Sequence, residues 1–315
     1  MLEYSWDEIR HWSLRDVSTW WDVGWSLLWR SVMQLAILTR LWEVVWWPFY
    51  AMLNRLNRET AIRFVNYGYL PTTEGQREEF APVLKRIKEE GLLEKHGTHV
   101  MLYEKTLKSC PEYPSFEGKS LVEVGCGHGG GVLWVDGQHN FKSVRGMDLW
   151  LADTLKGKAF QGSAMDIPLE EGSVDVILNV ESSHTYELLP VFYNEAFRVL
   201  KPGGYLLWSD FRCLGYRTDL NFSNAMESGF EEVSREDITA NVFASLGVQH
   251  HYIRELFHRH WYTRWFMIFW ANFWAMPGTA MYRMFRDRKL TYFTVCWRKP
   301  LRAGGKNNRR AQGQI

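Results

Sequence analysis

Two glycines and two acids in this chain have the types and the spacing of a nucleotide-binding site. They begin in the stretch from Leu121 to Gly131, LVEVGCGHGGG, which opens as an apolar run and ends in a glycine cluster. Gly125 and Gly127 allow a sharp turn and a close backbone approach to a ligand. The helix that follows would point its free N–H groups at that ligand. Asp148 lies 23 residues after Gly125, where a carboxylate ending a second strand is placed to bind a ribose diol.

The second acid, Glu123, indicates which ligand the turn accepts. Gly125, Gly127 and Gly130 match the pattern GxGxxG, so a dinucleotide is one candidate. Glu123 stands two residues before the first glycine and would repel a pyrophosphate, whereas it would attract the sulfonium and ammonium of S-adenosylmethionine. A glycine turn without a ligand is the remaining alternative, and four further elements downstream argue against it.

Strands and helices must alternate to position these residues. Val174 to Val180, VDVILNV, is a β-branched buried strand, and Tyr193 to Leu200 is an amphipathic helix that stops at KPGG. Tyr205 to Ser209 is the next strand, and Leu290 to Trp297 alternates as the last one. The alternation predicts an α/β fold with a doubly wound, mostly parallel sheet.

A second group of polar residues follows the strand at 174–180. Asn179 lies near its end, and Glu181-Ser-Ser-His184 comes directly after it. Polar side chains at the carboxyl end of a parallel strand lie in the crevice where open α/β sheets bind ligands. We therefore expect these residues to face the same crevice as the glycine turn.

Several motifs in order resemble a known enzyme family. VEVGCGHGG from Val122, the acid Asp148, GSAMDIP from Gly162 and RVLKPGG from Arg198 resemble class I S-adenosylmethionine-dependent methyltransferases. More narrowly, CGHGGG and LNVESSH resemble the phthiotriol/phenolphthiotriol dimycocerosate methyltransferases, which O-methylate a hydroxyl on a very apolar lipid. FVNYGY, HVMLY and GTAMYR are similar too, so the likeness covers about residues 63 to 300.

The resemblance implies a seven-stranded Rossmann-like methyltransferase fold, with S-adenosyl-L-methionine as the cofactor. Glu123, Gly125 and Gly127 would hold its methionine part, Asp148 its ribose, and Leu149 would pack on the adenine. Ser163 departs from the pattern, because family members often carry an acid there. The implied cofactor residues are Tyr103, Glu123, Gly125, Cys126, Gly127, Asp148, Leu149, Ser163, Ala164, Met165 and Asn179. Tyr67 and Tyr69 would border the substrate.

Methyl transfer to a hydroxyl requires alignment and removal of a proton. His184 is the candidate general base, with Glu181 near enough to orient it. The alternative is a histidine that only shapes the pocket. A sterol or prenyl-quinone C-methyltransferase, an N-methyltransferase acting on a soluble amine, and a catalytically silent, membrane-bound scaffold of the same fold also remain open.

Composition excludes several other classes. The net charge of the 315 residues is +1, so nothing draws the chain to nucleic acid. The four cysteines are scattered without a CxxC pair, which favours neither a disulfide framework nor a zinc site. His258 and His260 lack a neighbouring carboxylate or cysteine pattern. We therefore predict no metal.

The first 50 residues contain nine of the 17 tryptophans. Tryptophan favours membrane–water interfaces, and Val23 to Leu53 is the most apolar stretch. Arg30, Arg40 and Glu43 interrupt it, so it is predicted to lie in the interface. The catalytic part is predicted to face the cytosol, the side on which the arginines after the segment would place it if it spanned. Packing on its own domain and full spanning are the alternatives.

The predicted organisation has three parts. Residues 1–60 form the aromatic-rich amphipathic helical segment. Residues 61–300 form the methyltransferase domain with a helical cap at about 225–285, which includes the aromatic region Ile253 to Ala275. Residues 301–315 form a basic disordered tail able to touch anionic lipid.

Overall fold

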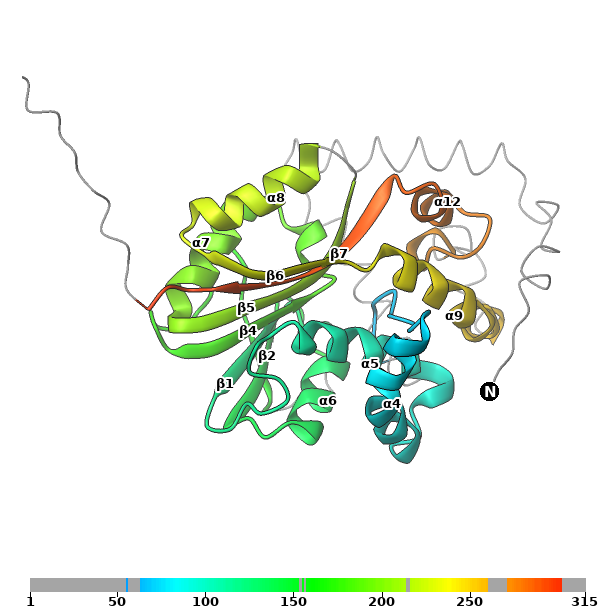
Figure 1. The fold of residues 1–315 in the computed structure, drawn as a ribbon, viewed down its shortest axis with the longest axis horizontal. Helices are drawn as coiled ribbons and strands as arrows, with labels where there is room; N and C mark the ends of the chain where they lie inside the picture. Colours follow the sequence, from blue (N-terminus) through cyan, green and yellow to red (C-terminus); the bar gives the residue numbers. More distant parts are fainter. Residues whose placement is uncertain are drawn as a thin grey trace, which may run out of the picture.

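A seven-stranded sheet forms the centre of the protein (Figure 1). The computed structural model describes residues 55, 63–152, 155, 157–213, 216–259 and 271–301. The strand order is β3-β2-β1-β4-β5-β7-β6, which confirms the predicted doubly wound sheet. The strands are β1 (Ser120–Val124), β2 (Ser143–Asp148), β3 (Ala159–Gln161), β4 (Val174–Val180), β5 (Leu200–Cys213), β6 (Glu231–Asp237) and β7 (Leu290–Arg298).

The direction of the strands places the carboxyl ends of the five parallel strands, β1 to β5, at one edge of the sheet. β1 pairs in parallel with β2 and β4, β2 with β3, and β4 with β5, whereas β7 pairs antiparallel with β5 and β6. The chain reverses its direction of travel across the sheet between β1 and β4. A crevice at such a reversal point, outside the carboxyl ends of the strands, is where open α/β sheets bind ligands.

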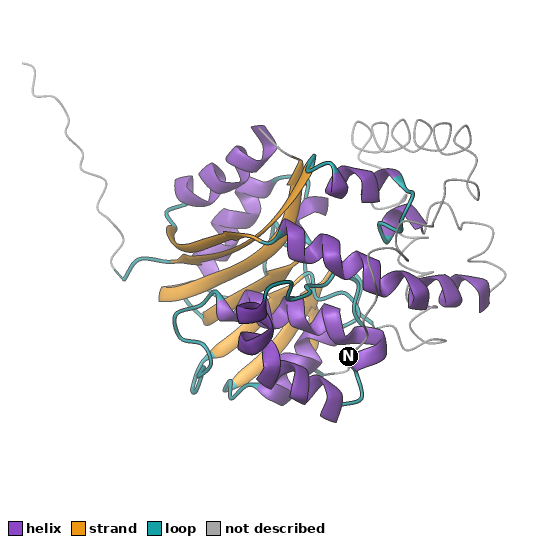
Figure 2. Ribbon diagram, turned by 45° about the vertical axis from the view of Figure 1, so that its right-hand side comes forward, coloured by secondary structure: helices purple, strands orange, loops and turns teal. Residues whose placement is uncertain are grey.

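Helices cover both faces of the sheet (Figures 1 and 2). On one face, Phe192 of α7 and Phe222 of α8 pack with Ile177 and Trp208 of the sheet. On the other face, α4, α5, α6, α9 and α12 contribute to a second core. The helices are α4 (Glu74–Glu89), α5 (Leu93–Lys108), α6 (Gly130–Gln138), α7 (Leu189–Val199), α8 (Tyr216–Glu227), α9 (Thr239–Arg259) and α12 (Ala280–Arg286).

The predicted helical cap at about 225–285 contains a strand. β6 lies within it and pairs with β7, for example Arg235 with Val295. Its sequence EEVSRED is charged and almost wholly exposed, as suits an edge strand. Its pairing comes from a strand more than 50 residues later, so no local pattern indicates it. α9 ends at Arg259, and residues 260–270 lie outside the described residues.

The predicted helix stop KPGG also belongs to a strand. Lys201 to Gly204 lie inside β5, where the pairing with β4 shifts register between Val174 and Val176. Gly203 has a φ of 81°, a conformation that favours glycine. The motif does end α7, but it does so as an irregular start of the next strand.

A buried carboxylate joins three helical elements on one face of the sheet. Glu104 of α5 is fully buried, and its Oε1 accepts hydrogen bonds from Trp134 Nε1 at 2.8 Å and His139 Nε2 at 2.9 Å. Tyr113 donates to Oε2 at 3.0 Å, and Arg86 of α4 lies 3.3 Å from Oε1. Burial alone would raise the pKa of Glu104, but His139 and Arg86 lower it below its ordinary value.

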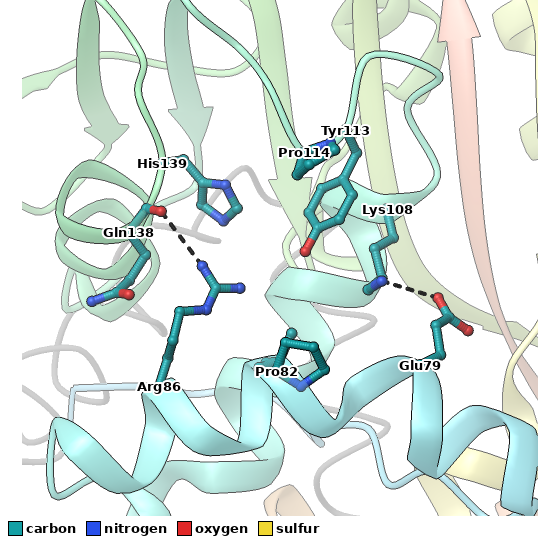
Figure 3. A pocket seen from close by; sticks show the side chains of 9 residues that line it. Glu79, Pro82, Arg86, Lys108, Tyr113, Pro114, Gln138 and His139 are labelled. Carbon is teal, nitrogen blue, oxygen red and sulfur yellow. Dashed lines mark hydrogen bonds and ion pairs between the residues drawn. The ribbon is translucent and has the colours of Figure 1, made fainter.

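A hollow of about 330 Å³ opens beside this cluster (Figure 3). In it Arg86 points toward the Gln138 carbonyl, and Lys108 lies 3.2 Å from Glu79. Each of these two cations already has a carboxylate partner, Glu104 or Glu79. The balanced charges are those of a structural contact between α4, α5 and α6.

The segments predicted to bind membranes lie outside the described residues. These are residues 1–60, apart from Arg55, and 302–315. Within the part of the chain that the structure describes, none of the helices has both the length and the apolarity to cross a bilayer.

The Glu104 cluster gives a stability prediction. Glu104→Ala should lower the free energy of unfolding at pH 7 by about 3 kcal/mol, because two buried donors, the half-buried Tyr113 and Arg86 lose their acceptor. The pKa of Glu104 is lowered by folding, so its contribution is complete above about pH 4.3 and is lost as pH falls. Urea unfolding at pH 7 and pH 4 measures both effects. Glu89→Ala, on the exposed surface of α4, is the control and should change the free energy by less than about 0.5 kcal/mol.

Candidate active site

The predicted adenosine-binding residues meet in one crevice. A cavity of about 190 Å³ lies at the carboxyl ends of β1 and β2. The segment after β4 closes its opposite side with Ser182, Thr185 and Tyr186. Six residues predicted from the sequence line it, namely Gly125, Asp148, Leu149, Ser163, Ala164 and Met165.

The glycine cluster divides into two parts with different roles. Gly125 and Gly127 have φ values of 75° and 52°, which form the turn. A Cβ on Gly130 would lie 2.5 Å from the Arg63 carbonyl oxygen, and one on Gly131 would lie 2.1 Å from the Tyr103 ring. The later glycines therefore allow close packing, which explains why a GxGxxG match arises without a pyrophosphate.

Asp148 lies at the end of β2, at the crevice. Its Oδ2 accepts from the Gly127 amide at 2.8 Å, and its Oδ1 accepts from the Trp150 amide at 3.3 Å. Burial raises its pKa, and these amides oppose the rise. The carboxylate is thus fixed by the glycine turn itself.

Glu123 lies on β1 beneath the turn and is fully buried. Its Oε1 accepts from the Tyr103 hydroxyl at 2.6 Å. Its Oε2 has no hydrogen-bond partner among the described residues. Burial raises the pKa of Glu123 to about 8, and the Tyr103 hydrogen bond opposes that rise.

Three predicted cofactor residues stand behind the crevice rather than lining it. Tyr103 binds Glu123, and Cys126 is buried against Gly146. The Nδ2 of Asn179 donates to the Val124 carbonyl and to the Tyr186 hydroxyl, both at 2.9 Å. These residues fix the turn and the end of β4.

His184 is held by an aspartate that the sequence analysis did not select. It lies in the short 3-10 turn η2 (Ser183–Thr185), and its Nδ1 is 2.9 Å from Asp210 Oδ1. The His184 amide donates to Asp210 Oδ2 at 2.8 Å. Asp210 is fully buried on β5. The expectation that Glu181 orients His184 was wrong.

The backbone explains why Glu181 points elsewhere. Its φ is 49°, a left-handed conformation that few residues other than glycine adopt. Its Oε2 accepts from the Tyr67 amide at 2.8 Å and from the Tyr292 hydroxyl at 3.0 Å. Burial raises its pKa well above the ordinary value, and the nearby Asp210 raises it further. Glu181 therefore anchors the segment that carries His184.

The two tyrosines predicted to border the substrate diverge. Tyr67 packs against Phe211, whose ring centroid also lies 4.4 Å from that of His184. Tyr69 is fully buried against Phe80 of α4, so its prediction as a substrate residue was wrong. Gly68 between them has a φ of 72°, which breaks the alternation of an extended segment.

Comparisons with known proteins identify the family of the chain. A family model described as a methyltransferase domain matches residues 122–208. The chain is 32% identical over 231 residues to the probable phthiotriol/phenolphthiotriol dimycocerosates methyltransferase 2 of Mycobacterium ulcerans, a match covering 70% of this chain and 84% of that one. It belongs to this family of class I S-adenosylmethionine-dependent methyltransferases.

This methyltransferase is also similar to a second curated relative in sequence and to a solved structure in fold. It is 34% identical to a fatty-acid O-methyltransferase of Mycolicibacterium smegmatis over 172 residues, which are 52% of this chain and 58% of that one. Its fold is similar to a putative sarcosine dimethylglycine methyltransferase from Galdieria sulphuraria, with a TM-score of 0.53 and 16% identity over 79% of this chain and 98% of the other.

The residues present fit S-adenosylmethionine, the cofactor of this methyltransferase. The unpartnered Oε2 of Glu123 offers a buried acceptor for a cation, and Gly127 has open space where a Cβ would stand. Asp148 would hold the ribose hydroxyls, with Leu149, Ala164 and Met165 beside the adenine. The cofactor supplies an electrophilic methyl group on a sulfonium.

No cluster of three or more metal-ligating side chains occurs in the described part of the methyltransferase. The side chains of His258 and His260 lie outside that part.

The sequence contains a signal that could have identified Asp210. It is the first acid after the predicted strand Tyr205 to Ser209, just as Glu181 follows the strand at 174–180.

Asp148 gives a direct prediction on cofactor affinity. Asp148→Ala should weaken S-adenosylmethionine binding by about 30- to 150-fold, because charge-assisted hydrogen bonds to the ribose are lost. Calorimetric titration measures the Kd. Glu187→Ala, an exposed residue at the rim of the same crevice, is the control and should bind nearly normally. An unchanged Kd for the Asp148 variant would remove this acid from the ribose.

Proposed function

We propose that this methyltransferase transfers the methyl group to a hydroxyl of a lipophilic substrate at a membrane surface, with His184 as the general base. The contact between His184 Nδ1 and Asp210 carries the proposal. Since an ionised Asp210 accepts a hydrogen bond, Nδ1 carries the proton and Nε2 presents a lone pair. The substrate proton would pass to Nε2 as the oxygen attacks the methyl carbon.

The charged groups around His184 favour an uncharged group, such as a hydroxyl, as the acceptor of the methyl group. Burial would raise the pKa of Asp210, but the positive charges of His184 in its protonated form and of Arg212 hold it below its ordinary value. Arg212 is 6% exposed and donates inward to Ser183 and Asn221. A carboxylate acceptor is already ionised at neutral pH and would approach a negative Asp210. A hydroxyl needs the base and avoids that repulsion.

The lipophilic substrate class rests on the relatives. The M. ulcerans relative is named for phthiotriol and phenolphthiotriol dimycocerosates, and the M. smegmatis relative for fatty acids. An aromatic cluster borders His184 on one side, because Phe211 contacts its ring and Tyr67 and Phe285 pack against Phe211. Apolar walls of this kind suit an acyl chain better than a small polar amine.

His184 is tested by substitution. His184→Gln should bind S-adenosylmethionine normally and lose about 10²- to 10⁴-fold in turnover at pH 7. The loss should shrink at alkaline pH, where more of the substrate hydroxyl ionises unaided. The assay follows labelled methyl transfer into a lipid extract of the source cells, with the cofactor Kd as the folding control. Near-normal turnover at pH 7 would leave alignment alone as the mechanism.

The membrane part of the proposal rests on Val23 to Leu53. Burying its apolar face gains about 25 cal/mol per Å², whereas a charge at the bilayer centre costs about 2.5–3.5 kcal/mol. Arg30, Arg40 and Glu43 therefore favour binding in the interface over spanning. The proposal includes a catalytic domain that faces the cytosol. If the segment did span, the acids before it and Arg55, Arg58 and Arg63 after it would put the domain on that side.

Deleting residues 1–55 tests the membrane association. The full-length methyltransferase should remain with membranes through a high-salt wash, and the truncated form should move largely to the soluble fraction. Cofactor affinity of the truncated form is the control for folding. Full-length protein that is soluble without detergent contradicts the proposal. Protease trimming of residues 1–20 from the opposite side of sealed vesicles would show that the segment spans.

A further inference from the structure

Arg212 contacts both residues that fix the turn carrying His184. It lies on β5, two residues after Asp210, and its Nη1 is 3.2 Å from Asp210 Oδ2. Its Nη2 donates to Ser183 Oγ at 2.7 Å, and Ser183 Oγ donates in turn to Asp210 Oδ2 at 2.7 Å. The guanidinium thus closes a buried ring of contacts behind the imidazole.

The rest of the guanidinium is fixed from the opposite side. Nε and Nη2 donate to Asn221 Oδ1 of α8 at 3.2 and 3.0 Å. The Trp208 ring lies 5.1 Å from the guanidinium carbon, and Trp208 Nε1 donates to Ser183 Oγ at 2.8 Å. Arg212 is therefore rigid, desolvated and unable to turn toward a substrate.

The charge of Arg212 has a consequence for the imidazole. A buried aspartate beside His184 stabilises the protonated ring, which cannot act as a base. A fixed cation on the same carboxylate offsets that stabilisation. The attraction between Arg212 and Asp210 is strong because both side chains are removed from water, in which opposite charges attract more weakly.

We propose that Arg212 is a positioning residue that keeps His184 in its neutral, proton-accepting form at neutral pH by balancing the charge of Asp210. This inference rests on the proposed function. Ser183 and Asn221 complete the arrangement, because they hold the guanidinium against the carboxylate.

Other ionisable groups around this pair must be considered with it. Glu181 lies at the end of β4, and its carboxylate is bound by the segment before α4 and by β7. The neighbouring phenols act electrostatically on Asp210 or Arg212. The full set is Asp210 and Arg212 on β5, Glu181 at the end of β4, Tyr67 before α4, Tyr186 after η2, Tyr193 on α7 and Tyr292 on β7.

The test is the pH dependence of turnover. Arg212→Gln removes the cation, so the acid limb of the kcat profile should move to higher pH by about one unit. Turnover should then be about tenfold lower than wild type near pH 6 and nearly equal near pH 9. Arg212→Lys keeps the charge and should leave the limb in place. A variant that lost the same fraction at every pH would show a merely structural role and overturn the inference.

A second variant avoids removing the arginine. Asn221→Asp places a carboxylate on the guanidinium, and the Nδ2 that it replaces has no hydrogen-bond partner among the described residues. Its acid limb should also move to higher pH. An unmoved limb in Asn221→Asp overturns the inference even if Arg212→Gln fails to fold.

The failure of this inference differs from failure of the proposed function. If His184→Gln keeps normal turnover in the same assay, His184 is no base and both ideas fall. If His184→Gln is inactive but neither Arg212→Gln nor Asn221→Asp moves the limb, only the role of Arg212 is contradicted. Kd values for S-adenosylmethionine show in each case that the cofactor site has formed.

Discussion

The arrangement of the residues around His184, where the methyl acceptor is proposed to bind, depends on one buried carboxylate, that of Asp210. It receives hydrogen bonds from the amide of His184 and from Ser183 Oγ, so it fixes the backbone of the turn as well as the imidazole. β5 places it there, and β5 is held between β4 and the antiparallel β7. The imidazole is therefore positioned by the centre of the sheet although it belongs to a loop.

Two fully buried acids in this site have opposite electrostatic settings. The pKa of Glu123 is raised to about 8, because its carboxylate has one phenol as partner and an oxygen left over. The pKa of Asp210 is lowered despite burial, because a cation and several donors surround it. Glu123 would thus gain its counter-charge from a cationic cofactor, whereas Asp210 has its own within the fold.

The cofactor half of the site was predictable because its signals are local. An apolar strand, a glycine turn and an acid 23 residues later occur in order along the chain, and the structure brings Gly125 and Asp148 to one crevice. The sequence also places His184 after β4. The motifs that occur in order along the chain predicted the cofactor and the sheet for the same reason, because each motif is formed by residues that are close together in the sequence.

The acceptor half depends on contacts between distant residues. Asp210, the partner of His184, lies 26 residues further along the chain. No residue pattern near Glu181 indicates its left-handed φ, which turns its carboxylate toward Tyr67 and Tyr292. Tyr69 was misplaced because Gly68 reverses the alternation. β6 was missed because its pairing with β7 is set by tertiary structure, and a charged edge strand has no apolar pattern.

The central claim, methylation of a hydroxyl, is tested most directly by the bond that the transferred methyl group makes. Lipid labelled with a radioactive methyl group by the enzyme is divided and treated with mild alkali or with hot hydriodic acid. A methyl ether resists alkali and releases methyl iodide in the acid, which is the result expected here. Release by alkali would show a methyl ester and a carboxylate acceptor, and release by neither would show methylation of carbon or nitrogen. Either of these results contradicts the account of His184 as the base for a hydroxyl.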